Sequence, residues 1–150
     1  MMASVKLLVA LLLLLLVGCS SPAAQDPAPE PEPERTWLGM VPGDAVPYDG
    51  PAGQLVLIYV DETYDVARHQ ASAITWKLGE DYTTDFFVEE DDGSLWWYGR
   101  RGSWRATRRG EGPRPLPVVD DRVTFGDRTI TLSDDGAPLQ VETPEGVFMR

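Results

Sequence analysis

The sequence predicts an all-β domain over residues 36–150, an antiparallel meander closed as a small barrel or folded as a sandwich. Three observations predict this class. Short apolar runs, rich in branched and aromatic residues, recur throughout the region. Turn residues separate the runs at close, even spacing, as between neighbouring antiparallel strands. In the last third, apolar residues alternate with polar ones, which is typical of strands with one buried face.

The first predicted strands precede residue 91. The run LVLIYV (55–60) is apolar throughout, which predicts a strand covered on both faces. The next two are SAITWKL (72–78) and YTTDFFVEE (82–90). The stretch 66–76 is the one place in the domain where the pattern allows a short helix.

A hairpin follows in the middle of the domain. DDGS (91–94) contains a glycine at a position that tolerates positive φ, so it predicts a turn. LWWYG (95–99) then returns beside 82–90. A second turn, RRGS (100–103), is predicted to lead into a further strand, WRATR (104–108).

The last third predicts four strands joined by short turns. They are RVTF (122–125), RTITL (128–132), LQVET (139–143) and VFMR (147–150). Alternation with polar residues predicts one inward face on these strands. The residues expected on that face are Val123 and Phe125, Ile130 and Leu132, and Leu139 and Val141.

An apolar segment precedes the predicted domain. Lys6 is followed by an unbroken apolar run from Leu7 to Val17. The run is shorter than the about 20 apolar residues that a membrane-spanning helix needs. It has the charged start and the length of a signal peptide, over residues 1–18. The run ends at Gly18 and Cys19, the single cysteine of the chain.

The sequence Leu16-Val17-Gly18-Cys19 resembles the lipobox of bacterial lipoproteins. The resemblance implies that a lipoprotein signal peptidase cuts before Cys19, whose sulfur carries a diacylglyceryl group. It also implies that the new amino terminus can receive a further fatty acid such as palmitate. Two or more chains anchor stably, since each buried methylene contributes about 0.8 kcal/mol. The alternative is a plain signal or anchor with an incidental cysteine.

The residue after the cysteine bears on localisation. Ser20 stands where an aspartate would resemble an inner-membrane retention signal. The resemblance therefore implies an extracytoplasmic protein, anchored to the outer membrane of a host with two membranes. In a host with one membrane, it would lie on the outer face of the plasma membrane.

Residues 19–35 join the anchor to the domain. After Cys19 this segment consists mainly of proline, alanine and acidic residues, with almost nothing to bury. Such a composition predicts a disordered linker. Its prolines favour the extended polyproline II conformation, at about 3.1 Å per residue.

Composition excludes several classes of function. The formal net charge of −11 disfavours non-specific binding to nucleic acid. A single histidine, His69, supports neither a transition-metal site nor a Ser-His triad. The acidic clusters at 89–92, 120–121 and 134–135 lack the spacing of a calcium loop. We therefore expect no metal and no cofactor.

Residues 81–106 resemble a block found in uncharacterised secreted bacterial proteins, which supports a β-rich fold and implies no activity. Ser94 and Arg100 depart from the block, where asparagine and an acidic residue would stand, and the segment between the hairpin and Gly102 is much shorter than in the block. The residues that fit are Asp92, Gly93, Trp96, Gly99, Gly102, Ser103, Trp104 and Ala106, with Trp97 and Tyr98 fitting as aromatics.

The candidate ligand-binding residues lie in and after the middle hairpin. They are the aromatic residues Trp96, Trp97, Tyr98 and Trp104 and the basic residues Arg105, Arg108 and Arg109. Alternation on a strand places Trp96 and Tyr98 on one face and Trp97 on the other. Two interpretations stay open for the rings: a central strand buried on both faces, or a platform for a flat ligand.

The arginines near the hairpin also have two interpretations. Basic residues interleaved with aromatic ones can bind phosphates. Alternatively, the arginines form exposed ion pairs with the nearby acidic residues, and such pairs contribute about 0–1 kcal/mol each. The acidic residues in question are Glu89, Glu90, Asp91 and Asp92.

Together these features predict a lipid-anchored, non-enzymatic binding or envelope-accessory module. Its expected partners are the membrane, through the lipid, and an envelope protein or anionic cell-wall polymer. An alternative is a binder of a small apolar ligand or glycan, with a pocket lined by aromatic rings. A small hydrolase is a third class, which the sequence supports least.

Overall fold

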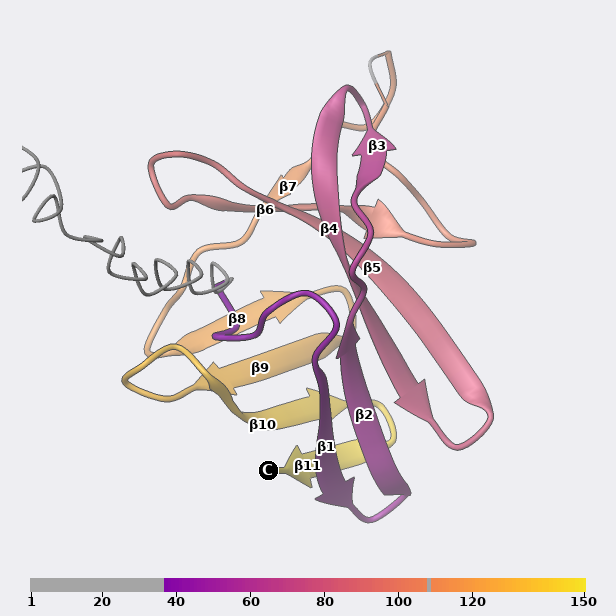
Figure 1. Ribbon diagram of the computed structural model, residues 1–150, viewed down its shortest axis with the longest axis vertical. Coiled ribbons are helices and arrows are strands. Elements are labelled where there is room, and N and C mark those ends of the chain that lie inside the picture. The colour runs from indigo at the N-terminus through magenta and orange to yellow at the C-terminus, as the bar shows by residue number, and fades with distance from the viewer. Residues whose placement is uncertain (1–36, 108) are drawn as a thin grey trace, which may run out of the picture. The chain divides into compact units, whose positions relative to one another are not determined.

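The computed structural model describes residues 37–107 and 109–150, and these contain strands but no helix. The predicted signal peptide, Cys19, the linker and Arg108 lie outside the described residues. Eleven strands form one curled sheet in which every pairing is antiparallel, so the predicted all-β class is confirmed (Figure 1). The strands are β1 (Ala45–Gly50), β2 (Gly53–Tyr59), β3 (Tyr64–Val66), β4 (His69–Leu78), β5 (Asp81–Glu89), β6 (Leu95–Arg100), β7 (Arg114–Pro115), β8 (Arg122–Phe125), β9 (Arg128–Leu132), β10 (Pro138–Thr143) and β11 (Gly146–Met149).

The sheet runs in the order β7-β6-β5-β4-β2-β1-β11-β10-β9-β8, with β3 paired to β4 outside this path. In Figure 1, β8 to β11 lie one below another, while β4 extends from the top of the molecule to the lower right and β5 returns from there toward the upper left. The strands from β7 to β1 in this order form one part of the sheet and β11 to β8 the other. The pairing of β1 with β11, in which Asp49 lies opposite Met149, joins the two parts. Most consecutive strands are neighbours in the sheet, which gives a meander.

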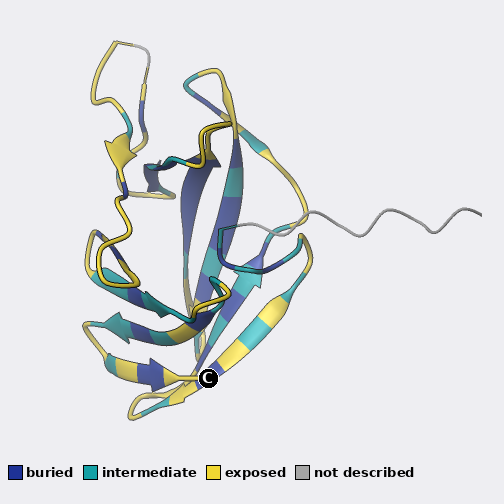
Figure 2. Cartoon of the chain, turned by 90° about the vertical axis from the view of Figure 1, so that its left-hand side faces the viewer, coloured by how far each residue is buried: buried dark blue, intermediate teal, exposed yellow. Residues whose placement is uncertain are grey.

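The concave face of the sheet holds the larger core. Leu57, Phe87, Ile130, Val141 and Phe148 are among its fully enclosed side chains. They come from β2, β5, β9, β10 and β11, so the curl brings the first and last thirds of the domain together. Figure 2 shows the buried residues along these central strands and the exposed ones mainly on turns and edges.

A second, smaller core lies on the other face of β4, β5 and β6, where β3 covers it. Phe86, Val88 and Tyr98 belong to this cluster, whereas Phe87 and Trp97 belong to the larger one. Strand β5 is buried from Thr84 through Val88 because it has a core on each face. The period of two along a strand divides the side chains between the two cores.

The region where a short helix was allowed forms a hairpin instead, so that prediction is wrong. Strands β3 and β4 are joined by a tight turn at Ala67 and Arg68, which have φ angles of 54° and 78°. Two-residue hairpin turns of this hand require positive φ and usually contain glycine, asparagine or aspartate. Neither residue is of that kind, so the sequence carries no turn signal here.

Two further predictions differ from the structure. Residues 104–107 form no strand, and only an isolated bridge joins Arg105 to Gly99. Leu139 does not face the core, because a register shift between Pro138 and Gln140 turns it outward. Pro138 and Val141 take the buried positions of β10, with a β-bulge between them.

Strand β1 was not predicted. It contains Pro47, and proline in a strand interior argues against a central strand because it lacks an N–H for the ladder. The structure tolerates it because β1 is registered to β11 only at Asp49, so Pro47 lies where β1 is paired with β2 alone.

Candidate functional site: an aromatic groove with a carboxylate rim

Strand β6 distributes the predicted aromatic residues between two environments. Trp97 is buried in the larger core, where its ring lies 5.0 Å from Trp104 and 5.8 Å from Phe125. Trp96 and Tyr98 face the opposite side and belong to the smaller core. The alternation predicted for β6 is therefore confirmed: Trp97 faces inward, whereas Trp96 and Tyr98 form an outer pair. Trp104 lies beyond the strand and packs against both cores.

Aromatic side chains pack against one another inside the curl of the sheet. Phe125 lies 5.2 Å from Phe87 and 5.7 Å from Trp76, measured between ring centroids. Edge-to-face and tilted pairs at these separations are ordinary core packing. Trp97 thus contributes to the larger core, and neither Trp97 nor Trp104 lines the pocket beside Trp96 and Tyr98.

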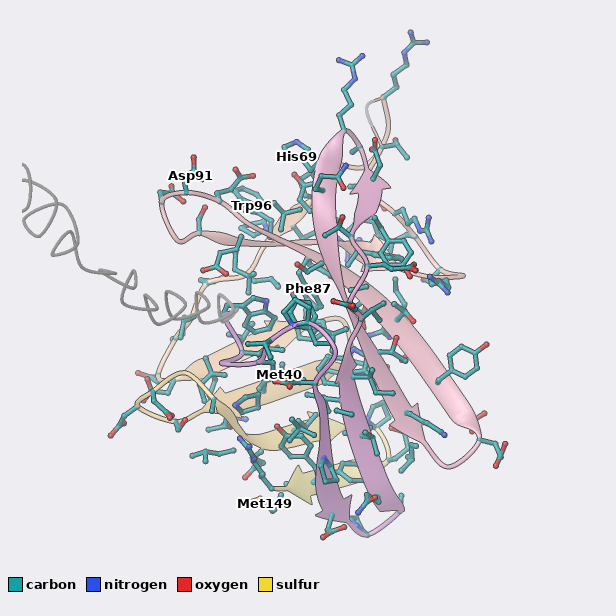
Figure 3. The ribbon with its side chains drawn as sticks, viewed as in Figure 1. Met40, His69, Phe87, Asp91, Trp96 and Met149 are labelled. Carbon is teal, nitrogen blue, oxygen red and sulfur yellow. The ribbon has the colours of Figure 1, made fainter. Side chains whose placement is uncertain are left out.

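The outer pair lies beside an open groove of about 490 Å³. The turn between β5 and β6 supplies its acidic and hydroxyl side chains, and β6 supplies its aromatic ones. His69, Asp91 and Trp96 lie at the same end of the molecule (Figure 3). The lining residues are Glu90, Asp91, Asp92, Ser94, Trp96, Tyr98 and Pro113.

Hydrogen bonds within the β5–β6 turn fix the groove. Backbone bonds join Glu90 N to Ser94 O at 2.9 Å and Gly93 N to Glu90 O at 2.8 Å. The Ser94 N–H donates to Asp92 Oδ1 at 2.9 Å, and Trp96 Nε1 donates to Ser94 Oγ at 3.2 Å. The indole is therefore tied to the turn that carries the carboxylates.

The groove carries negative charge at neutral pH. Hydrogen bonds from the Ser94 side chain and backbone lower the pKa of Asp92, which keeps this carboxylate ionised. Burial, and next the charge of Glu90, raise the pKa of Tyr98, so its phenol stays neutral. His69 Nδ1 lies 3.9 Å from Glu90 Oε1, and its ring lies 5.1 Å from Tyr98.

The predicted basic residues lie elsewhere. Arg105 is exposed, and its guanidinium carbon stands 4.5 Å from the ring centroid of Phe86. Arg101 stacks in the same way on Tyr64, at 5.5 Å. Arg109 is exposed and Arg108 lies outside the described residues. Stacked guanidinium groups of this kind cover ring faces and contribute about 0.5–1 kcal/mol at exposed sites.

The ion pairs of the arginines also differ from those expected. Within the part of the chain that the structure describes, no arginine pairs with the acidic residues at 89–92. The carboxylates that do pair with arginines are Asp85, Glu111, Asp127 and Glu142.

Among the described residues, Asp85 makes the most side-chain hydrogen bonds, and it is not one of the predicted site residues. It is 0% exposed and accepts hydrogen bonds from Trp97 Nε1 at 3.0 Å, Arg100 Nε at 2.9 Å and Arg128 Nη1 at 2.8 Å. Arg100 also donates to Asp127 at 2.9 Å. The available signal was an aspartate inside the apolar stretch TTDFFV, since a buried charge must be paired.

The direction of the pKa shift does not suit Asp92 to general acid catalysis. A general acid needs a carboxyl group whose pKa is raised, whereas that of Asp92 is lowered. Among residues 37–107 and 109–150 no group of three or more His, Cys, Asp or Glu is placed to hold a metal ion.

The same residues contain no helix that could span a membrane.

No protein family, curated protein or solved structure is significantly similar to this chain.

Proposed function

We propose that this protein is a lipid-anchored, extracytoplasmic binding module of a bacterial envelope, without enzymatic activity, that holds a positively charged segment of a partner protein. The observation that carries the proposal is the groove of about 490 Å³ in which Trp96 and Tyr98 adjoin the carboxylates of Glu90, Asp91 and Asp92.

The chemistry of the groove selects lysine and arginine side chains. A cation placed over an aromatic face gains about 0.5–1 kcal/mol at an exposed site and about 2 kcal/mol when desolvated. The carboxylates at the rim pair with the same cation, and the apolar stem of a lysine or arginine packs along the indole. The net charge of −11 attracts a basic segment over a longer range.

An anionic cell-wall polymer fits this site less well. Its phosphates would meet three carboxylates in the groove. Arg105 and Arg101, which would attract it, stack on Phe86 and Tyr64. An envelope protein is therefore the better of the two partners that the sequence suggested.

The anchor in this proposal rests on Cys19 and the residues before it. A diacylglyceryl group on Cys19 would hold the chain at the membrane, and the proline-rich linker would let the domain reach a partner beyond the lipid headgroups. Cys19→Ala should leave uncleaved precursor and abolish incorporation of labelled palmitate. Normal processing of that variant, with no label in the wild type, would contradict the anchor.

The binding proposal is tested on the full chain in phosphocholine-detergent micelles, with tryptophan labelled by ¹⁵N. The probe is a capped Lys-Gly-Lys-Gly-Lys peptide, with the Glu-Gly-Glu-Gly-Glu peptide as its counterpart. We expect the indole signal of Trp96 to shift saturably with the lysine peptide only. Replacing both Asp91 and Asp92 by Asn should weaken binding, by up to about fivefold for each carboxylate removed.

The chain offers a matched control. Asp120 and Asp121 form another exposed acidic pair, with φ angles of 49° and 58°, which asparagine tolerates. Their double replacement by Asn removes the same charge away from the groove and should leave the affinity unchanged. Equal weakening by both double variants would mean that only net charge matters. Binding of polyglycerol phosphate, lost on replacing Arg105 and Arg109 by Ala, would support the anionic polymer instead.

A further inference from the structure

A second pocket, of about 360 Å³, lies between the β4–β5 hairpin and the turns that lead into β9 and β11. Its volume falls at the lower end of the range of about 300–1,000 Å³ for small-molecule sites. Strands β4 and β5, the start of β9 and the β10–β11 turn all contribute. The polar and aromatic residues that line it are Trp76, Asp81, Tyr82, Thr83, Arg128, Thr143 and Glu145.

Two buried hydrogen-bond donors of this pocket have no protein partner. Trp76 is 2% exposed and the Arg128 side chain 10%, yet neither Trp76 Nε1 nor Arg128 Nε has an acceptor. A buried N–H without an acceptor costs about 1–3 kcal/mol. The Arg128 guanidinium also stands 5.0 Å from the Trp76 ring centroid, so the two donors belong to one place.

The two terminal nitrogens of Arg128 each have a protein acceptor. Its Nη1 donates to Asp85 at 2.8 Å, and its Nη2 donates to Thr83 Oγ1. Burial, and next the charge of Arg100, lower the pKa of Arg128, against the opposing effect of Asp85. Nε is therefore the one nitrogen of this guanidinium that has no protein acceptor, and it is the donor that we assign to a ligand.

The same pocket also contains acceptors. Glu145 accepts a hydrogen bond from Thr143 Oγ1 at 2.7 Å, and Asp81 is exposed. A free anion would be repelled by these two carboxylates, and a cation could not accept from the two unpaired donors. A hydroxyl group does both, because it accepts from N–H and donates to carboxylate.

From this combination we propose that the pocket between β4, β5 and β9 binds a small uncharged carbohydrate. Both nitrogens are buried from solvent, so the side chains above them must shift slightly before ring hydroxyls accept from Trp76 Nε1 and Arg128 Nε and donate to Glu145 or Asp81. Leu55 and Leu78 line the pocket, and Tyr82 is 68% exposed, so apolar surface is available for the C–H face of a sugar ring. The site is distinct from the groove at Trp96 and does not depend on it.

The test uses the full chain with ¹⁵N-labelled tryptophan, in micelles of a phosphocholine detergent that has no sugar headgroup. The probes are glucose, N-acetylglucosamine and cellobiose, with inorganic phosphate and glycine as charged counterparts. We expect at least one sugar to shift the Trp76 indole signal saturably while the Trp96 indole signal stays in place, and neither charged probe to do so.

Two variants make the test specific, with affinities measured by saturation-transfer NMR observed on the sugar. Trp76→Phe keeps an aromatic ring but removes the N–H, and should weaken binding about two- to tenfold, the value of one hydrogen bond. Tyr82→Ala, at a position where the side chain is 68% exposed, should also weaken sugar binding. Trp96→Phe is the matched control in the other groove and should leave the affinity unchanged.

Three results would overturn the proposal. One is an indole signal of Trp76 that no sugar moves, with cross-relaxation to water showing that a water molecule satisfies the donor. A second is a response to phosphate or glycine in place of sugar. The third is sugar binding with the same affinity in the wild type, Trp76→Phe and Tyr82→Ala, which would locate it elsewhere.

Discussion

Replacing Asp85 by Ala should strongly destabilise the domain, because the change leaves a buried positive charge without its partner. This carboxylate is 0% exposed and accepts hydrogen bonds from Trp97, Arg100 and Arg128. Without it, Arg100 keeps its bond to Asp127. Arg128, whose side chain is 10% exposed, keeps only its bond to Thr83 and has no carboxylate in contact among the described residues.

The expected loss follows from that difference between the two arginines. Removing one partner of a buried ion pair costs about 3–5 kcal/mol, because an uncompensated charge stays buried. Only Arg128 is left in this state, so we expect a loss within that range rather than twice as large. Domains have total stabilities of about 5–15 kcal/mol, so the loss is a large share. Asp85→Asn keeps one acceptor oxygen and should cost less.

The assay is equilibrium urea unfolding followed by tryptophan fluorescence, with the slope compared between variants. The decisive variant adds Arg128→Met to Asp85→Ala, because it removes the stranded charge. We expect this double variant to be more stable than Asp85→Ala alone. Asp127→Ala removes a half-exposed carboxylate and serves as the control, at about 0–1 kcal/mol. A loss below about 1 kcal/mol for Asp85→Ala, or additive losses in the double variant, would refute the reasoning.

Three further predictions concern single positions. Burial raises the pKa of Tyr48 from 10.0 to about 12, so the neutral phenol stabilises the fold fully below pH 10. About 3 kcal/mol of this stability should be lost as the pH rises from 10 to 12. Urea unfolding at several pH values measures the loss, and Tyr48→Phe should remove that part of the pH dependence. Gly99→Ala should cost at least about 2 kcal/mol in thermal unfolding, because a Cβ would lie 2.2 Å from the Trp104 carbonyl oxygen at a φ of +127°. Gly102→Ala is the control: its φ is +76° but the space around it is open, so it should cost about 1 kcal/mol. Leu139→Ala should change the free energy of unfolding by less than about 0.5 kcal/mol, since Leu139 is 47% exposed, whereas Val141→Ala should cost about 2 kcal/mol; equal losses would contradict the bulge.

The fold class could be predicted because its signals are local. Alternation along β8 and β9 and the glycine-containing turn before β6 each depend on a few neighbouring residues. The elements that were missed lack such signals. The β3–β4 turn places Ala67 and Arg68 at positive φ, and β1 contains a proline that only the incomplete β1–β11 pairing accommodates. The bulge at Pro138 shifts the register of β10 against β9. Such a shift depends on how two strands pair, so the pattern of apolar residues along one strand does not predict it.

The candidate site divides in the same way. The period of two predicted that Trp96 and Tyr98 would share a face, and they do. The partners of the arginines were beyond reach, because they depend on the curl of the whole sheet. Asp85 and Arg128 are 43 residues apart in sequence and meet only when β9 comes up against β5. Proximity along the chain suggested instead the acidic residues next to the hairpin.

The curl of the sheet explains why the basic residues near the β5–β6 hairpin do not make the groove beside Trp96 positively charged. Among the described strands, β8 forms backbone hydrogen bonds with β9 alone. Side chains, rather than backbone hydrogen bonds, therefore connect the β8–β9 hairpin to β6. Gly126 lets the β8–β9 turn approach, since a Cβ there would lie 3.1 Å from Trp97 Cη2.

Arg100 takes part in this connection, because it donates hydrogen bonds to Asp85 and Asp127. Arg101 and Arg105 cover the rings of Tyr64 and Phe86. Arg114 pairs with Glu111, and its guanidinium carbon stands 4.2 Å from the ring centroid of Trp104. The charged side chains that line the Trp96 groove are its carboxylates, which is the electrostatic reason to expect a cationic partner there.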